Sequence, residues 1–464
     1  MATEPLPARP NLEQLRKQAR ELQRQQGAHD TSSLSGAQRA VARRYGFSSW
    51  PRLKRHVEAI ASRTWILVDA TDDEPAADRL VRLACLNYVT DSPTQRRQAV
   101  ELWEQQPELA TASLAAAVVC GNVAEVRRRL SAEPAVVGAD TGPYAWPPLM
   151  YAAYGRLEAG LDSALEMVRL LLSEGANPND GRFFSGLPTP FSVLTGVFGG
   201  GENDQPPHPY AIALARLLLR SGADPNDGQT LYNRMFRAED DFLEVLLAFG
   251  LGQGDGGPWR RLLPDLLPAP PVLLRDLLGW AVTHDQRERV GLLARHGVDV
   301  VSPLPSGDTP IEAALRNGHS ELAEELRALG AQEPHLPPVD AFVAAALAAD
   351  AAAVRAAPEK VVEAARAARP GLIAWAAGQG RVDAVELLVS AGFDVNAMGR
   401  GDVPVEQPWQ TGLHTAVERG DAAMVRALLA LGADPSRRDK RFDATASDWT
   451  HHLERPEMAV LFDE

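Results

Sequence analysis

Glycines, carboxylates and a histidine gather in one short segment, and these residue types could bind phosphate or a metal ion. The segment is 199–210, Gly-Gly-Gly-Glu-Asn-Asp-Gln-Pro-Pro-His-Pro-Tyr. A phosphate-binding loop needs a strand before its glycines and Gly-Lys-Ser or Gly-Lys-Thr after them, and the sequence indicates neither. Glu202, Asp204 and His208 could ligate a metal, but loops rich in oxygen ligands with one histidine are common. We therefore predict no metal site and no cofactor, and we interpret 199–210 as a surface loop with a binding role.

Other reactive residue types give no catalytic pattern. The only cysteines are Cys85 and Cys120, which excludes a disulfide scaffold and a cysteine-rich zinc site. His451 and His452 fit a solvated chain end better than a metal site. The sequence contains no recognisable nucleophile elbow and no recognisable Ser-His-Asp spacing. Because the members of a triad need not be near in sequence, whether the chain is an enzyme stays open, and no catalytic residue is assigned.

The composition is that of a globular protein. The 464 residues include 47 Lys or Arg and 61 Asp or Glu, a net charge of −14, with 45% hydrophobic and 23% charged residues. No apolar run reaches the 18 or so residues that cross a bilayer. The first residues lack a signal-peptide pattern. We expect a cytoplasmic protein with no membrane partner. Only four of the basic residues are lysine, which together with the abundant Ala, Pro and Gly is typical of a GC-rich bacterial genome.

Two sequence landmarks recur in the same order and must position any site. The first is an apolar stretch ending in Leu-Leu, followed by Gly, a small or apolar residue, and Asp or Asn. The second, upstream of most copies, is a turn with Thr or Pro before a small-residue helix, as at 307–314 and 411–416. Thr309 can cap such a helix and Pro310 suits its first turn. The first landmark places its glycine at Gly175, Gly222, Gly392 and Gly432, with weaker copies at Gly250, Gly297 and Gly330.

This combination resembles the ankyrin repeat. The resemblance implies an all-α solenoid of helix-turn-helix repeats, with about nine copies between residues 110 and 435. The copies at 228–257 and 338–369 are degenerate. It also implies that His414 hydrogen-bonds the adjoining turn, and that a partner protein binds on the concave face and the hairpin tips. Because a single repeat cannot bury its apolar face, neighbouring repeats must stack and share one core.

The segments outside the repeats suggest four parts. Residues 1–63 form a basic helical extension, with helices expected at 12–22, 37–44 and 50–60. Helix, glycine turn and helix resemble a DNA-binding helix-turn-helix, but a cap over the end of the solenoid is the favoured interpretation. The remaining parts are a helical adaptor or degenerate leading repeat at 64–109, the solenoid at 110–440 with its insertion at 199–210, and a C-terminal cap at 441–464.

Aromatic residues concentrate around the predicted hairpin tips, and they are the candidate binding site. Rigid aromatic side chains are common anchors in recognition surfaces. Residues 1–63 carry a net charge of +7, so the remaining −21 favours a basic partner protein and opposes nucleic acid. The alternative function is binding or conversion of a hydrophobic small molecule in an aromatic groove under the 199–210 loop. The candidate binding residues are Tyr144, Trp146, Tyr151, Tyr154, Phe183, Phe184, His208, Tyr210, Tyr232, Asn233, Arg234 and Phe236.

Overall fold

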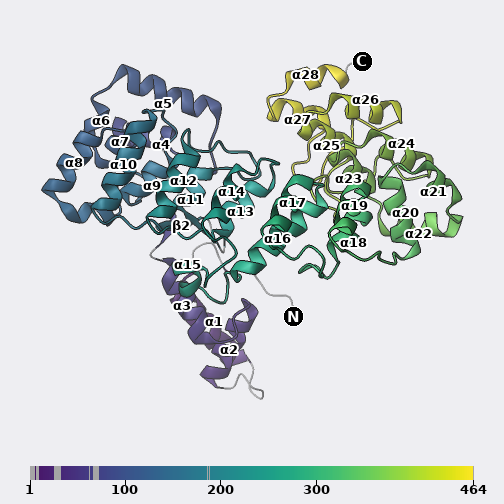
Figure 1. Cartoon of the computed structure of the whole chain (residues 1–464), viewed down its shortest axis with the longest axis horizontal. Coiled ribbons are helices and arrows are strands. Elements are labelled where there is room, and N and C mark those ends of the chain that lie inside the picture. Colours follow the sequence, from purple (N-terminus) through teal and green to yellow (C-terminus); the bar gives the residue numbers. More distant parts are fainter. Residues whose placement is uncertain are drawn as a thin grey trace. The chain divides into compact units, whose positions relative to one another are not determined.

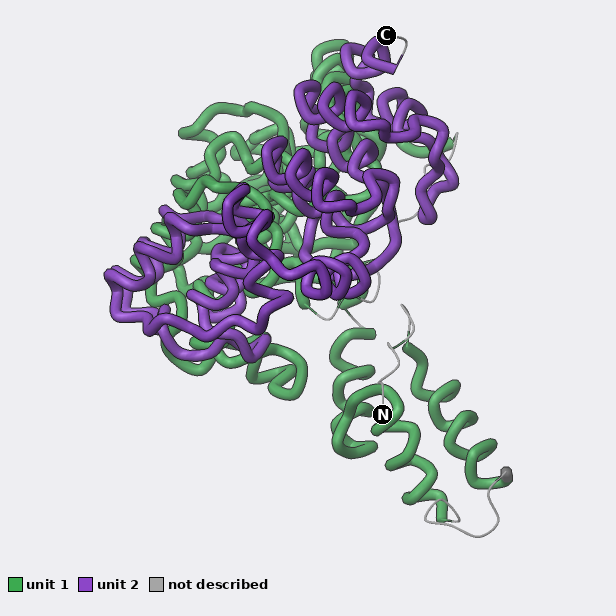
Figure 2. Tube along the Cα trace, turned by 90° about the vertical axis from the view of Figure 1, so that its right-hand side faces the viewer, with its two compact units in different colours: residues 1–274 green, residues 275–464 purple. Residues whose placement is uncertain are grey.

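The chain forms two compact units, residues 1–274 and residues 275–464 (Figure 2). The computed structural model describes residues 6, 10–25, 33–61, 63–65, 73–184, 187 and 189–462. Most of these residues are helical, as Figure 1 shows. The units divide inside the region predicted as one solenoid. The predicted part boundaries after residues 63, 109 and 440 therefore stay predictions.

Three helices open the first unit at the positions expected from the sequence. They are α1 (Leu12–Gln25), α2 (Leu34–Arg44) and α3 (Trp50–Ala61). Their apolar faces share a small core that includes Leu15, Val41 and Leu53. α3 also contacts the rest of the unit, because Ala59 and Ile60 pack with Leu263 and the Arg52 guanidinium lies 2.7 Å from the Asp265 carboxylate. The third helix therefore docks these helices onto the rest of the unit.

The rest of the first unit is a series of short helices. In chain order the elements are α4 (Ala76–Ala84), α5 (Pro93–Gln105), α6 (Leu109–Ala112), α7 (Leu114–Val119), α8 (Val123–Ala132), the 3-10 helix η1 (Pro134–Gly138), α9 (Pro148–Tyr154), α10 (Leu161–Ser173), α11 (Val193–Phe198), α12 (Ala211–Arg220), α13 (Gly228–Met235), α14 (Asp241–Ala248) and α15 (Gly257–Leu262). The helices α7, α9, α11 and α13 pack in succession as one row, and α8, α10, α12 and α14 pack as a second row. Successive helical hairpins therefore stack side by side.

A small sheet in the first unit was not predicted from the sequence. The strands are β1 (Thr64–Trp65), β2 (Gly181–Phe184) and β3 (Pro190–Ser192). β1 runs parallel to β2, pairing Trp65 with Phe184, and β2 runs antiparallel to β3. The structure is thus mostly helical, and the all-α expectation missed these three strands.

The second unit repeats the same arrangement. After α16 (Pro270–Thr283), which spans the boundary between the units, its inner helices α23 and α25 pack together and its outer helices α24 and α26 pack together. The elements are α17 (Arg287–Arg295), α18 (Pro310–Arg316), α19 (Ser320–Ala328), α20 (Pro338–Leu347), α21 (Ala351–Ala356), α22 (Glu359–Ala368), α23 (Leu372–Gly378), α24 (Val382–Ser390), α25 (Gly412–Arg419), α26 (Ala422–Ala430), α27 (Ala446–His452), α28 (Pro456–Ala459) and the 3-10 helix η2 (Val460–Phe462).

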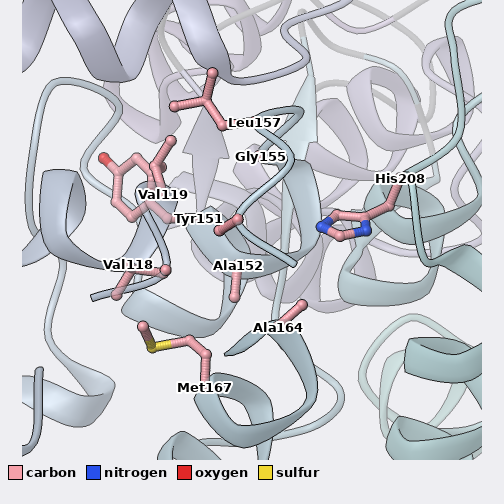
Figure 3. A pocket seen from close by; sticks show the side chains of 11 residues that line it. Val118, Val119, Tyr151, Ala152, Gly155, Leu157, Ala164, Met167 and His208 are labelled. Atoms are coloured by element: carbon pink, nitrogen blue, oxygen red, sulfur yellow. The ribbon is translucent and has the colours of Figure 1, made fainter. Parts of the chain in front are cut away.

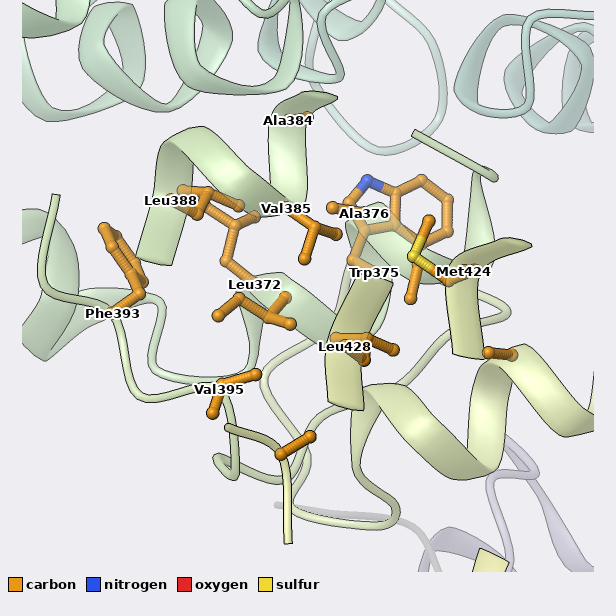
Figure 4. Packing of buried hydrophobic residues seen from close by; sticks show 14 of the residues in the cluster. Leu372, Trp375, Ala376, Ala384, Val385, Leu388, Phe393, Val395, Met424 and Leu428 are labelled. Atoms are coloured by element: carbon orange, nitrogen blue, oxygen red, sulfur yellow. The ribbon is translucent and has the colours of Figure 1, made fainter. Parts of the chain in front are cut away.

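Small residues let the inner helices of the second unit approach closely. Ala374, Ala376 and Ala377 on α23 are fully buried, and α23 packs directly on α25. Leucine and valine side chains from α24 and α26 fill the space behind them, as Figure 4 shows. At the C-terminal end, Trp449, Met458 and Leu461 extend this core, so α27 to η2 cover the last helical pair.

The predicted helix ends are present. Gly432 has φ +89°, its N–H donates to the Leu429 carbonyl, and the next N–H donates to the Leu428 carbonyl. A left-handed residue that ends a helix in this way is usually glycine. At the start of α25, His414 Nδ1 lies 2.8 Å from Thr411 Oγ1, and His414 Nε2 donates to the Ala444 carbonyl at 3.0 Å. The hydrogen bond from His414 to the adjoining turn is therefore confirmed.

We predict that Gly432→Val destabilises the protein by more than about 1 kcal/mol, because a β-branched side chain is strained in the left-handed region. Open space surrounds the Cβ position of Gly432, so the loss would report backbone strain and no clash. Denaturant unfolding measures it. The matched control is Gly138→Val, since Gly138 is equally open and its backbone is not left-handed. Equal effects of the two substitutions would contradict this account of the helix end.

A buried histidine and a half-buried arginine join four successive turns of the second unit. His319 Nε2 donates to the Thr283 carbonyl at 2.8 Å, so its Nδ1 accepts from Arg381 Nη2 at 2.6 Å. Arg381 Nη1 also donates to the Gly318 and Leu347 carbonyls, each at 2.9 Å. His319 must be neutral in this arrangement. Its burial, aided by the charge of Arg381, lowers its pKa to about 4.

We expect the free energy of unfolding to fall as the pH is lowered from about 6.5 towards 4. Over this range His319 binds a proton in the unfolded chain but not in the folded one, so acid favours unfolding. Denaturant titrations at several pH values should give a shallower pH dependence for His319→Gln, which keeps one donor and one acceptor but cannot titrate. An identical pH dependence for wild type and variant would refute the role of this histidine.

Candidate functional site

The aromatic residues predicted as a binding groove form an interior cluster around Trp65. The Trp65 ring lies edge-on to Trp146 at 4.6 Å, to Phe184 at 5.1 Å and to Tyr144 at 5.9 Å between ring centroids. Tyr154 also contacts it. Tyr144, Trp146, Tyr151 and Tyr154 are each less than 5% exposed. These residues pack against strand β1, and the space that a groove would need is filled by side chains.

The hydroxyl groups of this cluster are also satisfied internally. Tyr151 Oη donates to the Thr141 carbonyl at 2.6 Å, and Tyr154 Oη donates to the Ser192 carbonyl at 2.9 Å. Burial raises the pKa of both hydroxyls. Phe183 is buried as well, but it points into a separate cluster with Ala59, Ile60 and Leu263. The predicted groove residues therefore divide between two parts of the core.

The 199–210 loop is held in place by a buried arginine. Arg156 Nε donates to the Pro206 carbonyl at 2.9 Å, and its Nη2 donates to the Gly196 carbonyl at 2.7 Å. Burial lowers the pKa of Arg156 to about 10, so the guanidinium remains charged at neutral pH. The loop backbone adds two bonds, because Gly200 N–H donates to Gln205 O and Gly201 N–H donates to the Asn233 carbonyl. The glycine half of the loop is therefore packed against α13.

His208 is part of this packing. The Nδ1 atom of His208 accepts from the Tyr210 backbone N–H at 3.1 Å, and the backbone N–H of His208 donates to the Val197 carbonyl at 2.9 Å. Burial and the nearby Arg156 lower the pKa of His208 to about 3, so the imidazole is neutral. It borders an apolar crevice of about 20 Å³ with residues of α7, α9 and α10 (Figure 3). A pocket for a small-molecule ligand is typically larger than about 300 Å³, so this crevice is suited to little more than a water molecule.

A buried polar network lies beneath the loop. The Asp227 carboxylate accepts from the Thr230 N–H at 3.0 Å and from Thr195 Oγ1 at 3.2 Å, and also from the Ser192 hydroxyl. Burial raises the pKa of Asp227 despite these bonds. Asn233 Nδ2 donates to the Tyr88 hydroxyl at 3.0 Å. Since these groups satisfy one another, the network fixes the ends of α11 and α13 and offers no free acid or base.

The other residues predicted from the α13 region have different surroundings. Arg234 is buried, with its guanidinium 5.4 Å from the ring centre of Phe242 and 3.5 Å from the Asp241 carboxylate. Tyr232 is 42% exposed, its hydroxyl donates to Glu202 at 2.7 Å, and its ring meets the half-buried Phe236 edge-on at 5.3 Å. Tyr232 is therefore an exposed aromatic side chain held in one position.

Exposed residues around Tyr232, together with the half-buried Phe236, form what we call the α13 surface, which comprises Glu202, Asp204, Tyr232, Phe236 and Arg237. The Arg237 Nε donates to the Asp204 carboxylate at 2.7 Å, which fixes the tip of the loop beside α13. Glu202, Asn203 and Asp204 are all exposed. Of the twelve predicted binding residues, the structure leaves Tyr232, with the half-buried Phe184, Tyr210 and Phe236, accessible to a partner.

The described residues offer little for metal or membrane chemistry. Among them, no group of three or more His, Cys, Asp or Glu side chains is arranged to hold a metal ion. His451 and His452 are both exposed. Within the same residues, no helix combines the length and the apolar character that crossing a membrane requires.

Sequence reasoning missed Trp65 and Arg156. Trp65 lies just after the predicted boundary at residue 63. Its one distinguishing feature in the sequence is that few other aromatic residues lie near it. Arg156 follows Gly155 in the turn after the inner helix that ends at Tyr154, as Arg381 follows Gly380 after α23. A signal for Arg156 was the insertion itself, because an ordered loop requires a donor for its extra carbonyl groups.

Comparison with known proteins identifies repeats in both units. The family model described as Ankyrin repeat matches residues 146–181, in the first unit, and 409–440, in the second. The first match includes α9 and α10, and the second includes α25 and α26. No curated protein matches the chain.

We predict that Trp65→Ala destabilises the first unit by about 3–5 kcal/mol, the usual cost of removing a fully packed aromatic side chain. The near-ultraviolet circular dichroism of the aromatic cluster should weaken in parallel. Trp103→Ala is the control, since Trp103 is half-buried on α5 and should cost less. A Trp65 variant as stable as this control would mean that the cluster does not anchor β1.

Proposed function

Because the chain is an ankyrin-repeat protein, we propose that it is a scaffold that binds a partner protein, and that part of the binding energy comes from the α13 surface. Ankyrin repeats generally mediate interactions between proteins. We further propose that the stacked hairpins form one solenoid of about nine repeats between residues 110 and 435. The partner would contact its concave face and its hairpin tips.

The observation that carries this proposal is the fixed and exposed ring of Tyr232. An aromatic side chain that is already ordered loses little entropy on binding, and such residues are frequent anchors in interfaces. Glu202 and Phe236 hold the ring from two sides. The exposed Glu202 and Asp204 carboxylates beside it favour a basic segment on the partner.

No observation favours the two alternatives from the sequence. The crevice beside His208 is far too small for a metabolite, and the aromatic residues expected to line a groove are core. In the helix-turn-helix segment, α3 uses Ala59 and Ile60 to pack on the rest of the unit, as a cap would. We therefore do not propose catalysis or DNA binding.

The test is affinity purification of the tagged full-length chain after crosslinking, followed by binding measurements with the purified partner. We expect Tyr232→Ala to weaken binding of that partner about tenfold or more, equivalent to about 1.4 kcal/mol. The melting temperature should change little, because Tyr232 is 42% exposed and is not among the buried core residues. Leu161→Ala is the matched control, since Leu161 is 45% exposed in the same unit and carries no predicted role.

Two results would overturn the proposal. One is repeated purification without a protein that binds the isolated chain directly. The other is a partner whose affinity is the same for wild type, Tyr232→Ala and Leu161→Ala, which would exclude the α13 surface.

A further inference from the structure

Two neighbouring turns of the second unit meet at a stack of arginine and tryptophan side chains. The Arg400 guanidinium carbon lies 4.1 Å from the ring centre of Trp409, and that of Arg441 lies 4.6 Å from it. Arg441 also lies 4.9 Å from the ring centre of Phe442. The Lys440 N–H donates to the Trp409 carbonyl at 2.9 Å and so joins the two turns. We call Arg400, Trp409, Lys440, Arg441 and Phe442 the tip stack.

A buried carboxylate shapes the turn that carries the tip stack. Asp439 is 3% exposed, and it accepts from the backbone N–H groups of Arg441 and Phe442, both at 2.7 Å. The Trp449 indole N–H also donates to it at 3.1 Å. Because the Asp439 carboxylate is hydrogen-bonded inside the turn, it fixes the backbone of that turn. The side chains next to it in the sequence remain exposed. The side chain of Phe442 is consequently 59% exposed.

The outer side of this turn is positively charged. Arg437, Arg438, Lys440 and Arg441 are all exposed. The Asp443 carboxylate lies 4.0 Å from Arg438 and is 88% exposed, so this ion pair is weak. Among the described residues, no carboxylate forms an ion pair with Arg441. The turn is therefore a local positive area on a chain whose residues 64–464 carry −21.

Stacking prepares Arg441 for a further ligand. Contact with the rings of Trp409 and Phe442 uses the face of the guanidinium and leaves its in-plane N–H donors for a carboxylate. A guanidinium held in this way loses less side-chain entropy when it forms two hydrogen bonds to a carboxylate. The exposed Phe442 ring beside it can cover an apolar side chain of the same ligand.

We propose that the tip stack binds an acidic segment of a partner protein, with carboxylates on Arg441 and its basic neighbours and an apolar side chain against Phe442. Charge complementarity selects this ligand, because a basic segment would meet four exposed cations. The α13 surface carries exposed carboxylates and so selects the opposite charge. This inference rests on the proposed function to the extent that both assume a protein ligand.

The experiment uses the full-length chain and a short fluorescent peptide of alternating glutamate and leucine. Anisotropy should show saturable binding that weakens as salt is added. The double variant Arg437→Glu/Arg441→Glu should weaken this binding about tenfold or more. The matched control is Arg355→Glu/Lys360→Glu, since both residues are exposed elsewhere in the second unit and the change in net charge is the same. Phe442→Ala should weaken binding without changing the melting temperature.

Several results would overturn the proposal. They are absence of peptide binding, equal losses in the test and control double variants, or equal binding of a peptide with lysine in place of glutamate. A single-stranded oligonucleotide could bind more tightly than the acidic peptide and lose that binding in Arg437→Glu/Arg441→Glu. That result would assign the tip stack to nucleic acid instead. The Tyr232→Ala variant should bind the acidic peptide normally. Peptide binding that is lost only in the tip-stack variants would thus support this inference even if the α13 surface had no partner.

Discussion

Short helices that cannot bury their own apolar faces impose the constraint on which the rest of this structure depends. The inner helix α23 is only seven residues long, and its apolar side chains are buried because α25 and the outer helices cover them. Alanines at the contact allow this close approach. Each hairpin therefore needs a neighbour on both sides. The terminal segment from α27 to η2 meets this need at the C-terminal end.

The sequence was a good guide wherever a local motif determines the backbone. The glycine landmark correctly marked helix ends such as Gly432, and the motif around Thr411 correctly gave the hydrogen bonds of His414. These features depend on residues within one repeat and the next. Sequence reasoning therefore identified the family and most of the helices, although the full set of nine repeats stays a prediction.

The candidate site was much harder to predict, because local aromatic content does not reveal what covers it. Tyr144 and Trp146 pack on Trp65, which lies about 80 residues earlier in the chain and carries no repeat signal. The same aromatic residue types could have lined an open groove. Likewise, nothing within residues 199–210 reveals that the Arg156 guanidinium holds that loop in place. Among the twelve predicted binding residues, Tyr232 is the aromatic one that is exposed.

The two candidate surfaces use opposite means to hold an aromatic group at the surface. Beside Tyr232, a carboxylate accepts from the phenol hydroxyl and the surroundings are acidic. Beside Trp409, arginines cover the ring faces and the surroundings are basic. In each case a charged side chain both orders the ring and sets the charge of a ligand.

The pairing of β1 with β2 has a consequence for the order of events during synthesis. Thr64 pairs with Phe183, about 120 residues later in the chain. A ribosome adding about 5–20 residues per second needs of the order of ten seconds to produce that partner strand. Until then Trp65 lacks Phe184 and Phe191 of its cluster, whereas helices α7 to α10 already have their neighbours in the nascent chain. Trp65 therefore reaches its complete native surroundings only after strands β2 and β3 have been synthesised.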